Sequence, residues 1–102
     1  MARYRIDGTV VDTDNATASW DEGTRWDGRN HISLATGSQW DHEELYRSRR
    51  GRYYLIHTSQ WQGSTPYAEW VSPQEAARWL AINQPDLELP ADLAAAAAEV
   101  LE

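Results

Sequence analysis

The sequence of 102 residues contains no cysteine, no lysine and no phenylalanine. Without cysteine the chain has no disulfide bond, no thiolate nucleophile and no cysteine-ligated zinc, which suits a reducing compartment. No apolar run is long enough to span a bilayer, since the alanine tract 94–98 is short and only weakly apolar. The N-terminal residues also lack a signal-peptide pattern. We therefore expect a cytoplasmic protein that makes no membrane contact.

Arginine supplies all nine basic residues, and 16 acidic residues give a formal net charge of −7. This balance argues against non-specific binding to nucleic acid or to an anionic membrane. The charge is unevenly placed, because residues 47–83 hold five arginines and two glutamates while acids dominate 1–46 and 84–102. Six tryptophans and five tyrosines supply every aromatic side chain. Both residue types favour partly solvent-exposed positions and interfaces, so we expect several of these rings to be exposed.

Alternating apolar residues predict two β-hairpins. The first covers residues 3–11 and turns at Asp7-Gly8, where both turn positions of a type I′ loop need a positive φ. The second covers residues 44–57 and turns at Gly51. Its outgoing strand, residues 53–56, is apolar on both faces, which predicts a central position in a sheet.

Weaker patterns place the remaining strands and loops. Residues 30–36 are a predicted short strand with Ile32 and Leu34 on one face, and residues 67–71 are a predicted edge strand. The polar residues 13–19 indicate a loop or one helical turn. Residues 20–28 contain two glycines and three acids, which predicts an exposed loop.

A serine capping box predicts the first of two C-terminal helices. In the sequence starting at Ser72, the serine caps the helix, Pro73 suits its first position and Glu75 completes the box. Pro85 forbids continuation. The tail from residue 90 is rich in helix formers, and its apolar stripe consists of Leu93, Ala97 and Val100 or Leu101.

Together these elements predict a single α+β domain over residues 1–102. It is expected to contain an antiparallel sheet of four or five strands, built from hairpins, with both helices packed on one face. The residues expected to be among the most buried are Leu45, Leu55, Ile56, Trp79 and Leu80.

Three segments carry a family resemblance. VVDTDNATASW, EELYRSRRGRYYLI and PYAEWVSPQEAARWL resemble a set of small bacterial proteins associated with phage and mobile elements. The resemblance covers about two-thirds of the chain, and the loop after Ile56 departs from it because the relatives are richer in glycine there. It implies a fold and a genomic setting but no activity. Some small acidic proteins from that setting block host defence complexes, CRISPR effectors included, by occupying a surface. The matching residues are Asp12, Thr13, Leu45 to Arg47, Gly51, Tyr53 to Ile56 and Glu75 to Leu80.

No catalytic motif is present, and we expect no catalytic residue, no metal site and no cofactor. The sequence contains no Gly-x-Ser-x-Gly elbow and no glycine-rich phosphate loop. Within residues 41–44, DHEE, His42 and Glu43 would point to opposite faces of a strand, and no second histidine lies four residues away. A small hydrolase without a recognisable motif is the second alternative function, because 16 acids allow many carboxylate pairs.

The first functional hypothesis is a non-catalytic protein-binding accessory factor of a phage or mobile element, and an inhibitor of a host defence complex, similar to anti-CRISPR proteins, is one form that it could take. Exposed aromatic anchors dominate interface energetics, and acids complement a basic partner surface. The partner would be a host or element-encoded protein, and the chain itself a monomer or a homodimer. The predicted protein-binding residues are Trp20, Asp21, Glu22, Trp26, Asp27, Trp40 and Trp61.

The alternative is a nucleic-acid-binding module built on the second hairpin. Its tip, residues 47–52, gathers four arginines, with Tyr53 and Tyr54 beside them, a combination that grips phosphate and stacks bases. The net charge of −7 opposes this reading, so nucleic acid is not the expected partner. The competing interpretation is a solvated turn paired with neighbouring acids. The predicted nucleic-acid-binding residues are Arg47, Arg49, Arg50 and Arg52.

Overall fold

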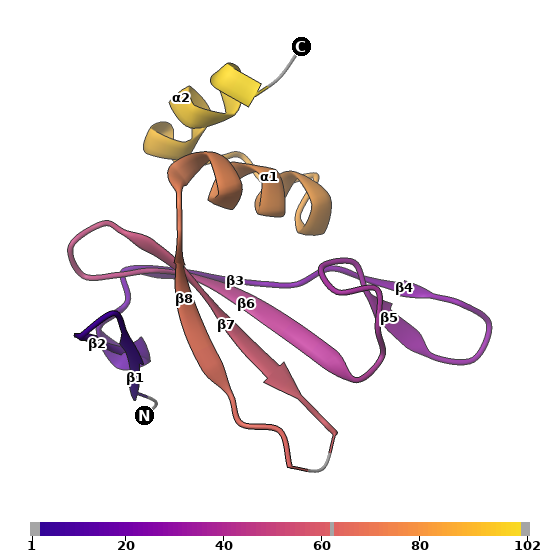
Figure 1. Ribbon diagram of the computed structural model, residues 1–102. Helices are drawn as coiled ribbons and strands as arrows, with labels where there is room; N and C mark the ends of the chain where they lie inside the picture. The colour runs from indigo at the N-terminus through magenta and orange to yellow at the C-terminus, as the bar shows by residue number, and fades with distance from the viewer. Residues whose placement is uncertain (1–2, 62, 101–102) are drawn as a thin grey trace.

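A four-stranded antiparallel sheet forms the centre of the molecule (Figure 1). The computed structural model describes residues 3–61 and 63–100, and side chains up to residue 96. The strands lie in the spatial order β3-β6-β7-β8, so β7 is interior and β8 is an edge, as predicted. Their bounds are β3 Ala18–Asp21, β6 Asp41–Arg47, β7 Tyr53–Ser59 and β8 Tyr67–Val71.

Two small hairpins flank this sheet at opposite ends of the view in Figure 1. In the first, Asp7 has φ 49° and Gly8 has φ 83°, which confirms the predicted turn with two left-handed residues. A 3-10 turn, η1, follows it. The bounds are β1 Arg3–Ile6, β2 Thr9–Asp12, η1 Thr13–Asn15, β4 Thr24–Trp26 and β5 His31–Ser33.

Strand β7 contributes to two separate apolar cores, because successive side chains of a strand point to opposite faces. Tyr53 and Leu55 face the helices, whereas Tyr54 and Ile56 face the β1–β2 hairpin. All four are buried. The predicted central position of this strand is confirmed, and the sequence signal that revealed it was apolar residues at both parities.

The helices α1 (Pro73–Asn83) and α2 (Ala91–Val100) cover one face of the sheet, as predicted. Ser72 accepts a hydrogen bond from the Glu75 backbone N–H at 3.1 Å, and the Ser72 N–H donates to Glu75 Oε1 at 3.3 Å. The capping box is therefore formed. Leu93 of α2 is fully buried, while the rest of its predicted stripe lies outside the described side chains. The core under the helices consists of Leu45, Tyr53, Leu55, Ala76, Ala77, Trp79, Leu80 and Leu93.

The β1–β2 hairpin packs on the opposite face of the sheet. Ile6 and Val11 are buried against Tyr54 and Ile56. All five residues expected in the core are buried: Leu45, Leu55, Ile56, Trp79 and Leu80. They divide between the two faces, with Ile56 alone on the hairpin side.

The prediction of an exposed loop over residues 20–28 is wrong in part. Strand β3 ends at Asp21, and Trp20 pairs with Leu45 of β6, so its ring packs beside the helix-side core. After it, Gly23 lies so close to α1 that a Cβ built there would come within 2.6 Å of the Asn83 carbonyl oxygen. Because Gly23 has no side chain, the chain between β3 and β4 can pack closely against the C-terminal end of α1.

The strand predicted over residues 30–36 is shorter than expected. It covers only His31–Ser33, and Leu34 is 37% exposed rather than on the buried face with Ile32. Ser33 explains the early end, because its hydroxyl accepts hydrogen bonds from the N–H groups of Ala35 and Thr36 and so favours a turn. Within the described residues, neither helix has the length and apolar character needed to cross a bilayer.

Candidate functional site

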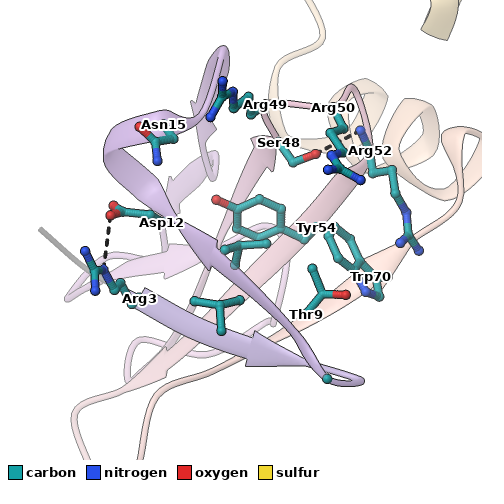
Figure 2. Close-up of a pocket in the computed structure, with 13 residues that line it drawn as sticks. Arg3, Thr9, Asp12, Asn15, Ser48, Arg49, Arg50, Arg52, Tyr54 and Trp70 are labelled. Carbon is teal, nitrogen blue, oxygen red and sulfur yellow. Dashed lines mark hydrogen bonds and ion pairs between the residues drawn. The ribbon is translucent and has the colours of Figure 1, made fainter.

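A pocket of about 660 Å³ opens between the β1–β2 hairpin, the β6–β7 turn and the hairpin-side face of the main sheet (Figure 2). We call it the arginine pocket, because four of the nine arginines line it and only one acidic residue does. Its lining residues are Arg3, Gly8, Thr9, Val10, Val11, Asp12, Asn15, Ser48, Arg49, Arg50, Arg52, Tyr54 and Trp70.

The β6–β7 turn presents three of these arginines. Gly51 adopts φ 86°, the left-handed conformation predicted for it, and the Ser48 N–H donates to the Arg52 carbonyl at 2.7 Å. The Ser48 hydroxyl accepts from the Arg52 N–H at 3.0 Å. Arg49 and Arg50 are exposed, and no described carboxylate pairs with either. Arg49 and Arg50 therefore do not form the ion pairs with described acids that the interpretation as a solvated turn predicted.

Arg52 is held in a different way. Its guanidinium carbon lies 3.9 Å from the centroid of the Trp70 ring, a cation–π arrangement. Trp70 belongs to β8, so this contact joins the turn to the edge strand. A planar guanidinium resting on an indole is a preorganised surface rather than a freely moving charge.

The facing wall belongs to the β1–β2 hairpin. Arg3 Nε lies 3.3 Å from Asp12 Oδ2, and the other Asp12 oxygen accepts the Asp14 N–H. Val10 is 58% exposed at this wall, although Val11 beside it is buried. The hairpin thus adds one paired arginine and an apolar strip to the pocket (Figure 2).

Tyr54 lies between the two walls. Its side chain is fully buried, stacked on Tyr46 at 5.4 Å between centroids and edge-on to Trp70 at 5.9 Å. Its hydroxyl has no hydrogen-bond partner among the described residues. Burial raises the pKa of Tyr54 to about 12, with smaller contributions from the Asp12 charge and from Tyr4. The hydroxyl is therefore a neutral donor without an acceptor among the described residues, and a buried donor without an acceptor is costly.

Two side chains predicted for this site belong to the other face. Arg47 donates to Thr17 Oγ1 at 3.0 Å and approaches Asp92 of α2 at 3.7 Å. The Tyr53 hydroxyl donates to the same Asp92 at 2.8 Å. Strand alternation separates them from Arg52 and Tyr54, and alternation is a signal that the sequence already contains.

The sequence interpretation missed Arg3, Asp12, Val10 and Trp70. None of them is near the arginine turn in the sequence. They reach the pocket because the N-terminal hairpin docks across the sheet and because Trp70 of β8 pairs with Tyr54. No local sequence pattern predicts contacts between residues so far apart in the chain.

The predicted protein-binding residues divide into exposed and structural ones. Trp26, Trp40 and Trp61 are exposed by 61%, 40% and 59%. Trp40 and Trp61 contact each other with 5.3 Å between ring centroids. Trp40 lies just before the start of β6, and Trp61 lies just after the end of β7. Trp26 is the last residue of β4 and lies edge-on to His31, so its expected loop position is wrong although its exposure is not.

Trp20 and Glu22 instead make packing and hydrogen-bond contacts within the fold. Trp20 is half-buried, with its ring 6.2 Å from that of Tyr53. Glu22 accepts hydrogen bonds from the Ser33 hydroxyl and from the Glu43 N–H, and it contacts His42 Nδ1.

The remaining two acids of the predicted protein-binding surface, Asp21 and Asp27, are exposed. The N–H groups of Asn30 and Arg29 donate to the Asp27 carboxylate and lower its pKa. Asp27 therefore shapes the β4–β5 turn while remaining a surface charge.

A carboxylate–imidazole–carboxylate chain crosses the helix-side face near the open end of the sheet. Glu43 Oε2 lies 3.0 Å from His57 Nδ1, and His57 Nε2 lies 2.9 Å from Glu69 Oε1. The Trp79 indole donates to Glu43 at 3.0 Å, and Tyr67 stacks on His57. These contacts tie β6, β7, β8 and α1 together. Across the described residues, no three His, Asp or Glu side chains are grouped as a metal ion would require.

Comparison of the chain with protein-family models, with curated proteins and with solved structures found no match.

Proposed function

We propose that this protein binds a phosphate-bearing ligand in the arginine pocket. The observation that carries the proposal is the Tyr54 hydroxyl, which is buried in a pocket lined by four arginines and has no hydrogen-bond partner in the described part of the chain. A phosphate oxygen would accept from this hydroxyl and from the guanidinium groups together, and charge-assisted hydrogen bonds of this kind are among the strongest in proteins.

The charge distribution supports an anion. Arg49 and Arg50 have no described carboxylate partner in a protein whose net charge is −7. Two unpaired arginines side by side in an acidic chain repel each other, and a bound anion relieves that repulsion. The arginine turn was the alternative among the functions inferred from sequence, and it is the one that the geometry supports best.

Isothermal titration calorimetry with inorganic pyrophosphate tests the proposal. We expect binding to the wild-type protein, and Arg49→Gln/Arg50→Gln to weaken it at least about tenfold because two charge-assisted contacts are lost. The matched control is Arg25→Gln/Arg29→Gln, which removes the same charge from the exposed β4–β5 hairpin. Equal weakening by both double variants, or no heat at about 1 mM pyrophosphate, would contradict the proposal.

A second candidate function, protein binding by an accessory factor of a mobile element, is favoured by the paired rings of Trp40 and Trp61. Both are exposed, and neither belongs to the two buried cores. Aromatic anchors of this kind are typical of interface centres. Asp21 and Asp27 are exposed acids and suit a partner with a basic surface, such as a nucleic-acid-binding defence complex.

Trp61→Ala tests this second candidate against a purified basic partner once one is recovered from the host. We expect the affinity to fall at least about thirtyfold, as for an aromatic hot spot, while the melting temperature stays unchanged. The control is Tyr67→Ala, which removes another exposed aromatic ring that lies outside the tryptophan pair. Equal losses for the two variants would mean that the tryptophan pair is not an anchor.

A further inference from the structure

The arginine pocket has two chemically different parts. Anion-binding groups are the guanidiniums of Arg49, Arg50 and Arg3 together with the Tyr54 hydroxyl, whereas Trp70 and Val10 supply a ring and apolar surface. A simple inorganic anion would use only the first part. A pocket of about 660 Å³ is also within the range that accommodates a small organic ligand.

From this division we infer that the ligand is a nucleotide, with its phosphates at the arginine side and its base against Arg52 and Trp70. The inference rests on the proposed function and specifies the class of ligand. The shared chemistry is a nucleoside phosphate, which comes either from a free nucleotide or from the end of a single strand.

The stacking surface is the Arg52–Trp70 pair. One face of the Arg52 guanidinium lies against the indole at 3.9 Å, and no second ring or carboxylate of the described residues engages this arginine. Flat bases stack on arginine planes as they do on aromatic rings. Trp70 keeps the guanidinium in place, so little side-chain freedom is lost when a base stacks on it.

Two polar side chains of the pocket wall suit the rest of a nucleotide: Thr9 lies beside Trp70, and Asn15 lies near Asp12 at the other end of the pocket (Figure 2). The Thr9 hydroxyl and the Asn15 side-chain amide line the same pocket, and an amide offers both a donor and an acceptor to a base edge or a ribose hydroxyl. The acidic segments 1–46 and 84–102 would repel a long polyanion. We therefore expect a short ligand rather than an extended strand.

The test compares adenosine diphosphate, inorganic pyrophosphate and adenosine by calorimetry in one buffer. We expect adenosine diphosphate to bind at least about tenfold more tightly than pyrophosphate, as one stacked base allows, and adenosine to bind most weakly. Equal affinities for adenosine diphosphate and pyrophosphate would overturn the nucleotide inference while leaving the anion site intact. No binding of any of the three would overturn both.

Arg52→Lys isolates the stacking contribution, because it keeps the charge and removes the plane. We expect its preference for adenosine diphosphate over pyrophosphate to disappear, because lysine offers no plane on which a base can stack. The matched control, Arg49→Lys, should keep the preference, since the exposed Arg49 makes no cation–π contact with a described ring. Retention of the preference in Arg52→Lys would overturn the assigned stacking surface.

Nuclear magnetic resonance places the ligand. The indole N–H signal of Trp70, assigned by its loss in Trp70→Phe, should shift with adenosine diphosphate and move far less with pyrophosphate. A stationary Trp70 signal at saturation would contradict the site. A 5′-phosphorylated oligothymidylate decides the source: binding no tighter than adenosine diphosphate supports a free nucleotide, and tighter, steeply salt-dependent binding supports a strand end.

Discussion

Tyr53 and Tyr54 are adjacent in β7, yet their hydroxyls lie in opposite surroundings. Tyr53 points to the helices and donates to Asp92, while Tyr54 points to the arginine pocket and donates to nothing in the described chain. Both rings are buried and both support a core. The two residues differ in the hydrogen bonding of their hydroxyl groups, so each serves as a control for the other.

We predict opposite effects on stability when each hydroxyl is removed. Tyr54→Phe should raise the free energy of unfolding by about 1–3 kcal/mol, because an unsatisfied buried donor is eliminated. Tyr53→Phe should lower it by about 0.5–1.5 kcal/mol through loss of one hydrogen bond. Chemical denaturation of the two variants beside the wild-type protein measures both.

The same pair also tests the pocket. Tyr54→Phe should weaken pyrophosphate binding even as it stabilises the fold, and Tyr53→Phe should leave binding unchanged. A Tyr54→Phe protein that is less stable than wild type would mean that the hydroxyl is satisfied in solution, and the main support for the ligand site would be lost.

At the scale of elements, the first helix depends on the capping box at its N-terminus. Ser72→Ala removes the side-chain acceptor of the Glu75 N–H, and we predict a loss of roughly 0.5–2 kcal/mol in the free energy of unfolding. Ser72→Asp is the matched control, since aspartate caps equally well and should retain most of the stability. If the alanine and aspartate variants unfold at the same denaturant concentration, the cap does not stabilise this helix.

The elements that sequence analysis predicted correctly are those with a local signal. Gly51 and Asp7-Gly8 mark tight turns, and Ser72 with Glu75 marks a helix start, all through contacts between residues a few positions apart. Strand β3 was missed because its order comes from pairing with β6, more than 20 residues later, and not from its own short polar sequence.

The arginine pocket was half predicted for the same reason. Arg49, Arg50 and Arg52 lie on one turn, and their grouping could be read directly from the sequence. The wall formed by Arg3 and Asp12 depends on the docking of one hairpin on the far face of the sheet, which burial of Ile6 and Val11 drives. An apolar pair on a short hairpin does not reveal which surface it will cover.

At the scale of the whole molecule, several tyrosines hold their protons more strongly than free tyrosine does. Burial raises the pKa of Tyr53 and of Tyr54 from 10.0 to about 12, and burial with a hydrogen bond to Glu44 raises the pKa of Tyr46 further. In the unfolded chain these groups lose their protons near pH 10. Between pH 10 and about 12 the unfolded state therefore binds fewer protons than the folded state.

We predict that this contribution to stability is constant below pH 10 and falls as the pH rises from 10 towards 12. Denaturant midpoints measured across this range test the sign. The double variant Tyr53→Phe/Tyr54→Phe should show a shallower decline, since two of the shifted groups are gone. A midpoint that rises with pH in this window would contradict the burial of these phenols.

The two-faced burial of β7 has a consequence for the exchange of its backbone amides with solvent. The backbone of residues 53–56 is paired with strands on both sides and covered by a core on each face, so the amides of these residues exchange only when the whole fold opens. A ligand in contact with Tyr54 slows the exchange of each of these amides by the same factor, which grows with the ratio of ligand concentration to dissociation constant. Deuterium uptake by this one strand would therefore report whether the pocket is occupied. Residues whose side chains face the helices, away from the ligand, would report it as well.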